Sequence, residues 1–219
     1  RDEKLSLDLQ SICKDLQLRE GGRRVVKTGG LDRASFVLWS AAYDAGVSEW
    51  KVRIDKQTGV IFVGCMREPY TPQEGFARNL ATPAWMIGSY GYVCRTGPSG
   101  QLSLTDHAKE QIGDKTVGAL SFGTGSVITM RLNRDDGTLE LGVDDKPRFK
   151  LGGVDRQARP FINIAFEGDA ASLLACDSST PAEDAGAAEA EATLEEGAAG
   201  GVTEEELNRL RAEADEFWS

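Results

Sequence analysis

Two strand-like runs separated by a short polar turn constrain the fold of this chain more than any other feature. From Glu49 to Ile54, apolar and charged residues alternate with the period of a half-buried strand. The run from Val60 to Val63 is apolar, which is typical of a strand buried on both faces. Residues 56–59 between the runs are polar and end in glycine, as a turn requires. The pattern therefore predicts a β-hairpin over residues 49–64, around which the other strands are arranged.

The rest of the chain to residue 176 has the same character. Short apolar or alternating runs follow one another with Gly-rich turns between them, and no convincing helix is predicted before residue 177. Residues 96–115 are predicted as a long polar loop with one short strand. We therefore expect an all-β fold, an antiparallel β-sandwich of the concanavalin-like jelly-roll kind. The further predicted strands are 15–18, 23–27, 35–39, 84–87, 90–95, 101–104, 116–121, 126–132, 138–143, 160–166 and 171–176.

The composition divides the chain into three predicted parts: a sandwich over 1–176, a linker over 177–202 and a helix over 203–219. The linker is rich in Ala, Glu and Gly and lacks aromatic residues, so it is predicted to be disordered. In the last part, Thr203 and Glu206 have the spacing of a capping box. An amphipathic face that could bind a helix partner follows, formed by Leu207, Leu210 and Phe217.

Charge and cysteine content limit the classes of function. The formal net charge is −10, which argues against a nucleic-acid binder. Residues 177–219 hold 13 Asp and Glu against two Arg, so the first 176 residues are nearly neutral. The sequence contains no run of about 20 apolar residues, so no membrane span is predicted. Four widely spaced cysteines favour buried free thiols over disulfides, and hence a cytoplasmic, reducing location. A first residue Arg1 is compatible with a trimmed or excised chain.

Several segments, in order, resemble the SPRY or B30.2 domain family. Residues 49–54 resemble its Trp-Glu-Val-Glu segment, and Val63-Gly64-Cys65 its Val-Gly-Val. Residues 133–138 resemble the family's Leu-Asp-Tyr-Glu-x-Gly hairpin, and residues 159–161 match its closing Arg-Pro-Phe. Residues 7–9 and 15–25 resemble the PRY extension. In this chain Lys51 and Arg53 replace acidic residues of the family motif.

The resemblance implies two curved antiparallel sheets and a function in binding other proteins through loops at one end of the sandwich. A role as the targeting part of a larger protein or of a ubiquitin-ligase assembly is expected on the same basis. The implied partner-binding residues are Arg67, Glu68, Tyr70, Gly88, Ser89, Tyr90, Phe166 and Glu167. Aromatic residues at loop ends suit an interface anchor, although capping the edge of the core is an equally good interpretation. Removing the side chains of Tyr90 and Phe166 is predicted to abolish partner binding with little change in melting temperature.

Nothing in the sequence favours an enzyme, a metal site or a cofactor. The single histidine, His107, lies in the polar segment without a Gly-x-Ser-x-Gly elbow. The Asp135-Asp136 and Asp144-Asp145 pairs are at predicted turns, where Asp is favoured for backbone reasons. The basic residues are scattered along the chain rather than grouped. A lectin-like, carbohydrate-binding sandwich stays the alternative, and a calcium-dependent change in melting temperature would favour it.

Overall fold

A computed structural model describes residues 15–29, 35–38, 45–67, 82–99, 101–112 and 120–179, with the backbone alone for 35–38, 106, 109, 110 and 175–179. The chain divides into two units, residues 1–182 and 183–219. Nearly all of the predicted linker and the whole predicted helix, with Leu207, Leu210 and Phe217, lie outside the described residues. The last described strand runs to Ser179, three residues beyond the predicted end of the sandwich.

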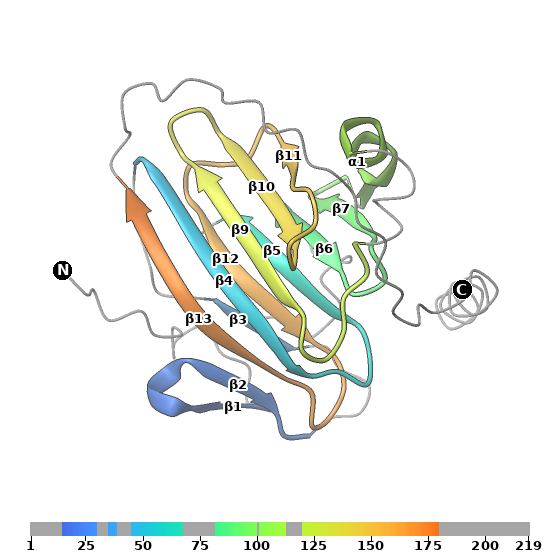
Figure 1. The fold of residues 1–219 in the computed structure, drawn as a ribbon, viewed down its shortest axis with the longest axis vertical. Helices are drawn as coiled ribbons and strands as arrows, with labels where there is room; N and C mark the ends of the chain where they lie inside the picture. The colour runs from blue at the N-terminus through green and yellow to red at the C-terminus, as the bar shows by residue number, and fades with distance from the viewer. Residues whose placement is uncertain are drawn as a thin grey trace. The chain divides into compact units, whose positions relative to one another are not determined.

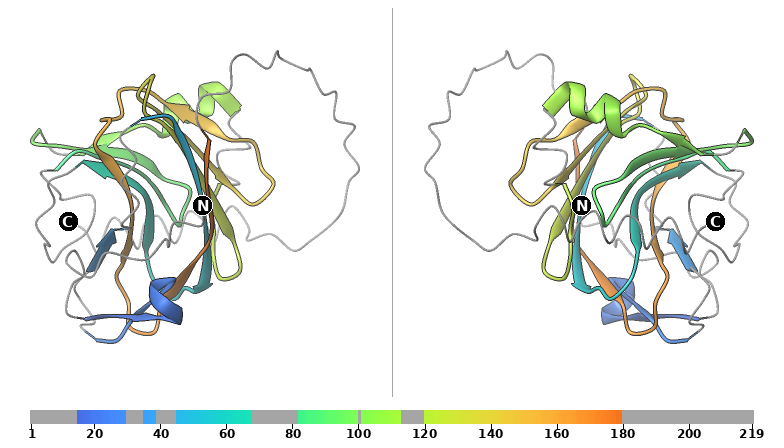
Figure 2. Two further views of the ribbon diagram at one scale, coloured as in Figure 1. Left: turned by 90° about the vertical axis from the view of Figure 1, so that its left-hand side faces the viewer. Right: turned by 90° about the vertical axis from the view of Figure 1, so that its right-hand side faces the viewer.

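The described residues form two antiparallel sheets packed face to face (Figures 1 and 2). The seven-stranded sheet has the order β1 (Leu16–Arg19), β2 (Arg24–Lys27), β13 (Ala170–Ser179), β4 (Val47–Lys56), β9 (Val127–Asn133), β10 (Thr138–Val143) and β11 (Phe149–Leu151). The six-stranded sheet has the order β3 (Ser35–Leu38), β12 (Ala158–Ile164), β5 (Ile61–Arg67), β6 (Ala84–Gly88), β7 (Val93–Thr96) and β8 (Leu102–Ser103). A 3₁₀ turn, η2 (Glu20–Gly22), joins β1 to β2. The predicted all-β antiparallel sandwich is confirmed.

The predicted central hairpin is wrong, although both of its strands are present. β4 lies in the seven-stranded sheet, between β13 and β9, whereas β5 lies in the six-stranded sheet, between β12 and β6. The connection over residues 57–60, which contains most of the predicted turn, therefore carries the chain from one sheet to the other. A polar turn ending in glycine can join two strands of one sheet or connect two different sheets, and its local sequence is the same in both cases. The two cases differ in which distant strands pair with each run.

Two elements depart from the prediction for the more polar segments. Residues 96–115 contain β8, inside the predicted short strand 101–104, and also an eight-residue helix, α1 (Thr105–Ile112), where only loop was expected. The helix is anchored by the buried Ala108 and by Gln111, whose side chain bonds both to the Lys150 carbonyl oxygen at 2.7 Å and to the Lys150 N–H at 2.8 Å. The side-chain amide of Gln111 thus makes the hydrogen bonds with β11 that a neighbouring strand would otherwise make. β11 is an edge strand, and the sequence pattern did not predict it.

The main core lies between the two sheets, and β5 has buried side chains on both of its faces. Ile61, Val63 and Cys65 belong to the main core, while Phe62 and Met66 belong to a second apolar cluster. Because alternate residues of a strand point to opposite faces, the second cluster covers the other face of the six-stranded sheet. This confirms the prediction that this run is buried on both faces.

Arg134 links the two sheets from the β9–β10 turn, with its side chain almost fully buried. Its Nη1 donates to Ser48 Oγ on β4 at 3.1 Å, and its Nη2 donates to the Ala158 carbonyl oxygen on β12 at 3.3 Å. The guanidinium carbon lies 5.7 Å from the centre of the Trp50 ring. Trp50 is itself fully buried.

Candidate protein-binding end of the sandwich

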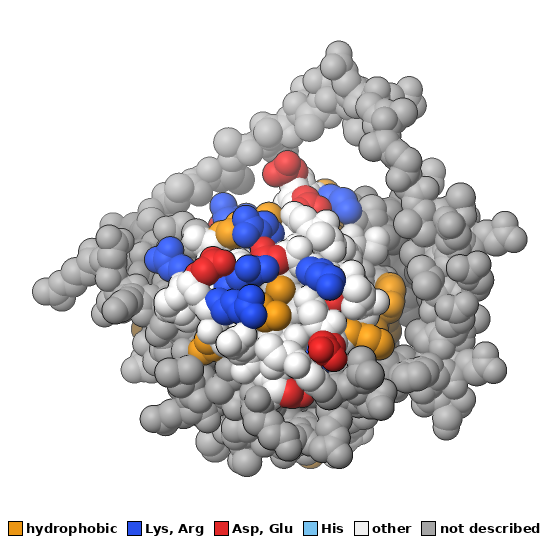
Figure 3. Space-filling model, turned by 90° about the horizontal axis from the view of Figure 1, so that it is seen from below, with side chains coloured by type: hydrophobic (Ala, Val, Ile, Leu, Met, Phe, Trp, Pro, Cys, Tyr) orange, Lys and Arg blue, Asp and Glu red, His pale blue; other side chains and the backbone are white. Residues whose placement is uncertain are grey.

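The strand register decides which predicted site residues share an end of the sandwich. On β5, Ile61 lies opposite Ile164 and Phe62 lies opposite Gly88. The turns that follow Gly88 and Ile164 therefore lie beside the start of β5. These turns carry five of the predicted residues: Gly88, Ser89, Tyr90, Phe166 and Glu167. We call this end of the sandwich the loop end, and Figure 3 looks onto it.

Arg67 lies at the opposite end. It is the last residue of β5, lies opposite Ala158, and forms an ion pair with Asp155, Nε to Oδ2, at 3.1 Å. Six residues of extended chain separate it from Ile61, a distance of about 20 Å. Glu68 and Tyr70 lie outside the described residues. The structure thus does not bring Arg67 to the loop end.

Gly88 and Ser89 are buried and hold the loop end together rather than contacting solvent. The Ser89 N–H donates to the Ile61 carbonyl oxygen at 2.9 Å, and the Ser89 carbonyl oxygen accepts from Phe122 N–H at 2.9 Å. Gly88 N–H donates to the Tyr92 carbonyl oxygen at 2.7 Å. The two residues therefore position the turn that carries Tyr90, because their polar groups bond to other loop-end segments.

Asp169, which the sequence analysis did not select, is the central brace of the loop end. Its side chain is fully buried. Its carboxylate accepts from Thr58 N–H at 2.6 Å, from Thr58 Oγ1 at 2.8 Å and from Gly59 N–H at 3.2 Å. These bonds fasten the β12–β13 turn to the crossing between β4 and β5. An Asp three residues after Phe166 resembles ordinary turn chemistry in the sequence, so only its long-range partners reveal this role.

Phe166 lies on the same crossing and is half-buried. A Cβ atom at Gly59 would lie 1.8 Å from Cδ2 of the Phe166 ring, so the glycine is needed for the ring to lie flat on the turn. Phe166 is thus both a surface aromatic and a packing residue. The expectation that its removal would leave the melting temperature nearly unchanged has to be revised, because its ring covers the crossing.

Three predicted residues remain accessible at the loop end: Tyr90 and Phe166 are partly exposed, and Glu167 is exposed. Exposed Thr58 and Thr124 join them, since Thr124 Oγ1 accepts from Gln57 N–H at 3.0 Å and so lies beside the crossing. The loop end therefore presents two partly exposed aromatic rings, hydroxyl groups and one carboxylate on a braced framework. Such a surface can bury an apolar side chain and hydrogen-bond a peptide backbone.

The described residues contain no group of three or more His, Cys, Asp or Glu that could hold a metal ion. His107 lies on α1, where it is exposed and its Nε2 lies 2.9 Å from Gln111 Nε2. Cys65 and Cys94 are free and buried. Burial raises the pKa of the Cys65 thiol to about 12, against a smaller opposing effect of Arg134. A thiol with a raised pKa is a poor nucleophile at neutral pH.

Cys65 is therefore expected to resist alkylation in the folded protein. With the pKa raised from 9.0 to about 12, the thiolate fraction at pH 8 falls about a thousandfold. Iodoacetamide should modify the peptide containing Cys65 readily in concentrated urea and very slowly in buffer, as measured by mass spectrometry. Equal rates in the two solutions would contradict the burial of this thiol.

The comparisons with known proteins agree with this architecture. No family model and no curated protein matches the chain. The SPRY domain of human HERC1 superposes with a TM-score of 0.57 at 20% identity, covering 77% of this chain and 96% of that one. The PSpry domain of TRIM65 superposes with a TM-score of 0.54 at 14% identity, covering 78% of this chain and 92% of that one. This sandwich has the SPRY-domain fold. Over the described residues, no helix is long and apolar enough to cross a membrane.

Proposed function

We propose that this SPRY-fold sandwich is a non-enzymatic protein-interaction module, and that its loop end binds a partner protein or short peptide. The observation that carries the proposal is the bracing of three loop-end segments by Asp169 and Ser89, which keeps Tyr90 and Phe166 partly exposed. An aromatic side chain on a braced framework loses little conformational entropy when a partner covers it, so it can contribute more to affinity than one on a mobile loop.

The resemblance to the SPRY family extends the proposal to a role as the targeting part of a larger protein or of a ubiquitin-ligase assembly. In such a role the sandwich recognises the target and leaves the chemistry to other domains. Glu68 and Tyr70 stay predicted contacts for the same partner. The comparisons do not favour the carbohydrate-binding alternative.

Tyr90→Ala combined with Glu167→Lys is expected to abolish capture of the partner from native cell extract. The first change removes an aromatic anchor and the second reverses an exposed charge. Substitution of an exposed residue costs little free energy of unfolding, and truncation of a half-buried tyrosine costs about 1 kcal/mol. The melting temperature should therefore fall by only about 3 °C. The test is a pull-down with mass spectrometry, beside a thermal melt of each variant. Phe166 is left intact because of its contact with Gly59.

The matched control is Leu102→Ala combined with Arg156→Glu, which also truncates one exposed side chain and reverses one charge. Leu102 lies opposite Arg95, and Arg156 lies just before β12, so both are far from the loop end. The control should capture the same proteins as the wild type. If the loop-end variant also captures them, the binding site is elsewhere.

A further inference from the structure

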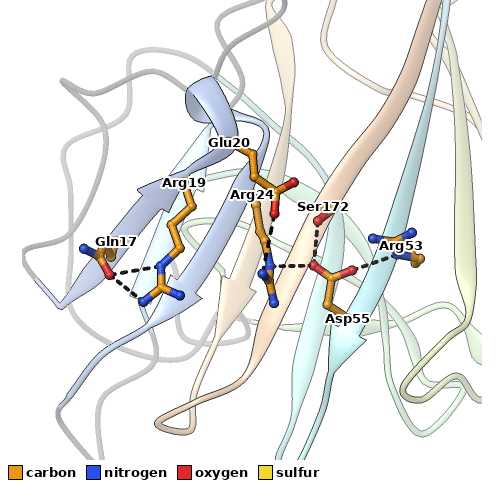
Figure 4. Close-up of polar contacts among 7 residues, drawn as sticks. All are labelled: Gln17, Arg19, Glu20, Arg24, Arg53, Asp55 and Ser172. Atoms are coloured by element: carbon orange, nitrogen blue, oxygen red, sulfur yellow. Dashed lines mark hydrogen bonds and ion pairs between the residues drawn. The ribbon is translucent and has the colours of Figure 1, made fainter.

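The outer face of the seven-stranded sheet carries a row of arginines beside the loop end. Arg19 lies opposite Arg24 across β1 and β2, Arg24 lies opposite Ser172 of β13, and Ser172 lies opposite Arg53 of β4. Residues directly opposite each other on neighbouring strands share a face. Arg19, Arg24 and Arg53, which we call the arginine row, therefore form a line across four strands (Figure 4). Seen from the loop end, Lys and Arg side chains gather on one half of the described surface (Figure 3).

Asp55 holds two of these arginines in place. Its carboxylate lies 2.7 Å from Arg53 Nε and 3.0 Å from Arg24 Nε, and it accepts from Ser172 Oγ at 2.5 Å. Burial acts to raise the pKa of Asp55, while the Ser172 hydroxyl acts to lower it. The two guanidinium groups lower it further, and the resulting pKa lies below the ordinary value of 3.8. The carboxylate is thus charged at neutral pH and orients both arginines.

The arginine row has more donors than the described residues use. Arg53 donates through Nε, and both of its Nη atoms have no hydrogen bond or ion pair among the described residues. Arg24 Nη1 lies 3.5 Å from Glu20 Oε1, and within the described part of the chain Arg19 bonds only to Gln17. The side chains of Arg24 and Arg53 are 33% and 48% exposed. Free Nη groups on partly exposed, oriented guanidinium groups can form paired bonds with carboxylates.

We propose that the arginine row binds an acidic peptide segment of a partner protein, in addition to contacts at the loop end. Neighbouring strands are about 4.8 Å apart, so Arg24 and Arg53, two strands apart, are separated by about 10 Å. An extended peptide advances about 3.3 Å per residue and its alternate side chains share a face, so carboxylates two or four residues apart, about 7 or 13 Å, bracket this separation. A segment of repeated acidic residues crossing the strands would reach all three arginines.

The acidic residues beside the arginine row favour a short peptide over a larger polyanion as its ligand. Asp55 and Glu20 lie beside the row, so a nucleic acid or an anionic membrane, whose negative charge extends over a larger area, would also meet these carboxylates. A short peptide responds mainly to charges within the screening length, about 8 Å at physiological salt. The binding of a short acidic peptide therefore depends on the local excess of guanidinium groups over carboxylates.

The test uses the full chain and a short fluorescein-labelled polyglutamate peptide, with fluorescence anisotropy as the readout. The wild type should bind polyglutamate, more weakly as salt is added, and should not bind a polyglutamine peptide of equal length. Arg19→Gln combined with Arg53→Gln should weaken binding about tenfold, because two charged donors are lost while Arg24 keeps its ion pair with Asp55. Lys150→Gln combined with Arg156→Gln removes two exposed charges elsewhere and should leave the affinity unchanged.

The proposal is overturned if polyglutamate does not bind, or if the arginine variant binds as tightly as the wild type. It is also overturned if single-stranded RNA or anionic vesicles bind more tightly than polyglutamate and lose affinity in that variant. Should the double variant prove unstable, Arg19→Gln alone is informative, since Arg19 contacts only Gln17 among the described residues, and a loss of about threefold is expected. Tyr90→Ala should keep its affinity for polyglutamate, so a failure of the loop-end proposal and a failure of this one are distinguishable.

Discussion

Gly64→Ala is expected to prevent stable folding. Gly64 is at the centre of β5, between Phe161 of β12 and Met86 of β6. A Cβ atom there would lie 2.0 Å from the Trp85 carbonyl oxygen and 2.7 Å from Met86 Cα, which are both backbone atoms. The backbone can yield only by separating β5 from β6, so we expect a loss of more than about 4 kcal/mol, at the upper end of the range for single substitutions.

The measurement is urea unfolding followed by circular dichroism, together with the yield of soluble protein. Gly97→Ala is the matched control, because a Cβ at Gly97 would have no atom within 4 Å. The control should unfold at nearly the same urea concentration as the wild type. A Gly64→Ala protein as stable as the Gly97→Ala protein would mean that β5 and β6 do not approach as closely as described.

Asp169→Ala is expected to destabilise the protein by about 3 kcal/mol, which lowers the melting temperature by about 9 °C. The change removes the buried acceptor of the N–H groups of Thr58 and Gly59, and Gly59 is itself buried. It also releases the crossing between β4 and β5 from the turn that carries Phe166 and Glu167. We therefore expect weaker partner binding at the loop end even at temperatures where the variant is folded.

Amide hydrogen exchange separates the local effect from the global one. In Asp169→Ala, Thr58 and Gly59 should exchange much faster, while the amides of β9 and β10 should change only as far as the global stability falls. Thr58→Val, which removes one of the three bonds to Asp169, is the graded control and should have a smaller effect. Unchanged exchange at residues 58 and 59 would show that another group holds the crossing.

Strand positions were largely predictable because they depend on local alternation. Residues 138–143 were predicted with the boundaries that β10 has, and the Asp-Gly turn before them does join β9 to β10. The helix α1 was missed because its helical periodicity is weak and, among those of its side chains that the structure describes, the fully buried one is an alanine, Ala108. It is held by contacts with β11, which lies about 40 residues later in the chain.

The site was predictable only in part. The turns that carry Tyr90, Phe166 and Glu167 meet at one end, as the family resemblance implied, but Arg67 lies at the other. Gly88 and Ser89 brace the framework instead of lying on its surface. The sequence analysis found the basic residues scattered, because 34 positions separate Arg19 from Arg53 in the chain. Strand pairing makes them members of one row.

The sequence by itself determined the class of fold and the positions of most strands. Each of these depends on residues close together in the chain, whose alternation and turn chemistry are the same in any context. Only the tertiary structure decided that β4 and β5 belong to different sheets, that Asp169 joins two distant turns, and that three arginines form a row. These features depend on which strands pair and in which register, and a register is chosen by burial summed over the whole core.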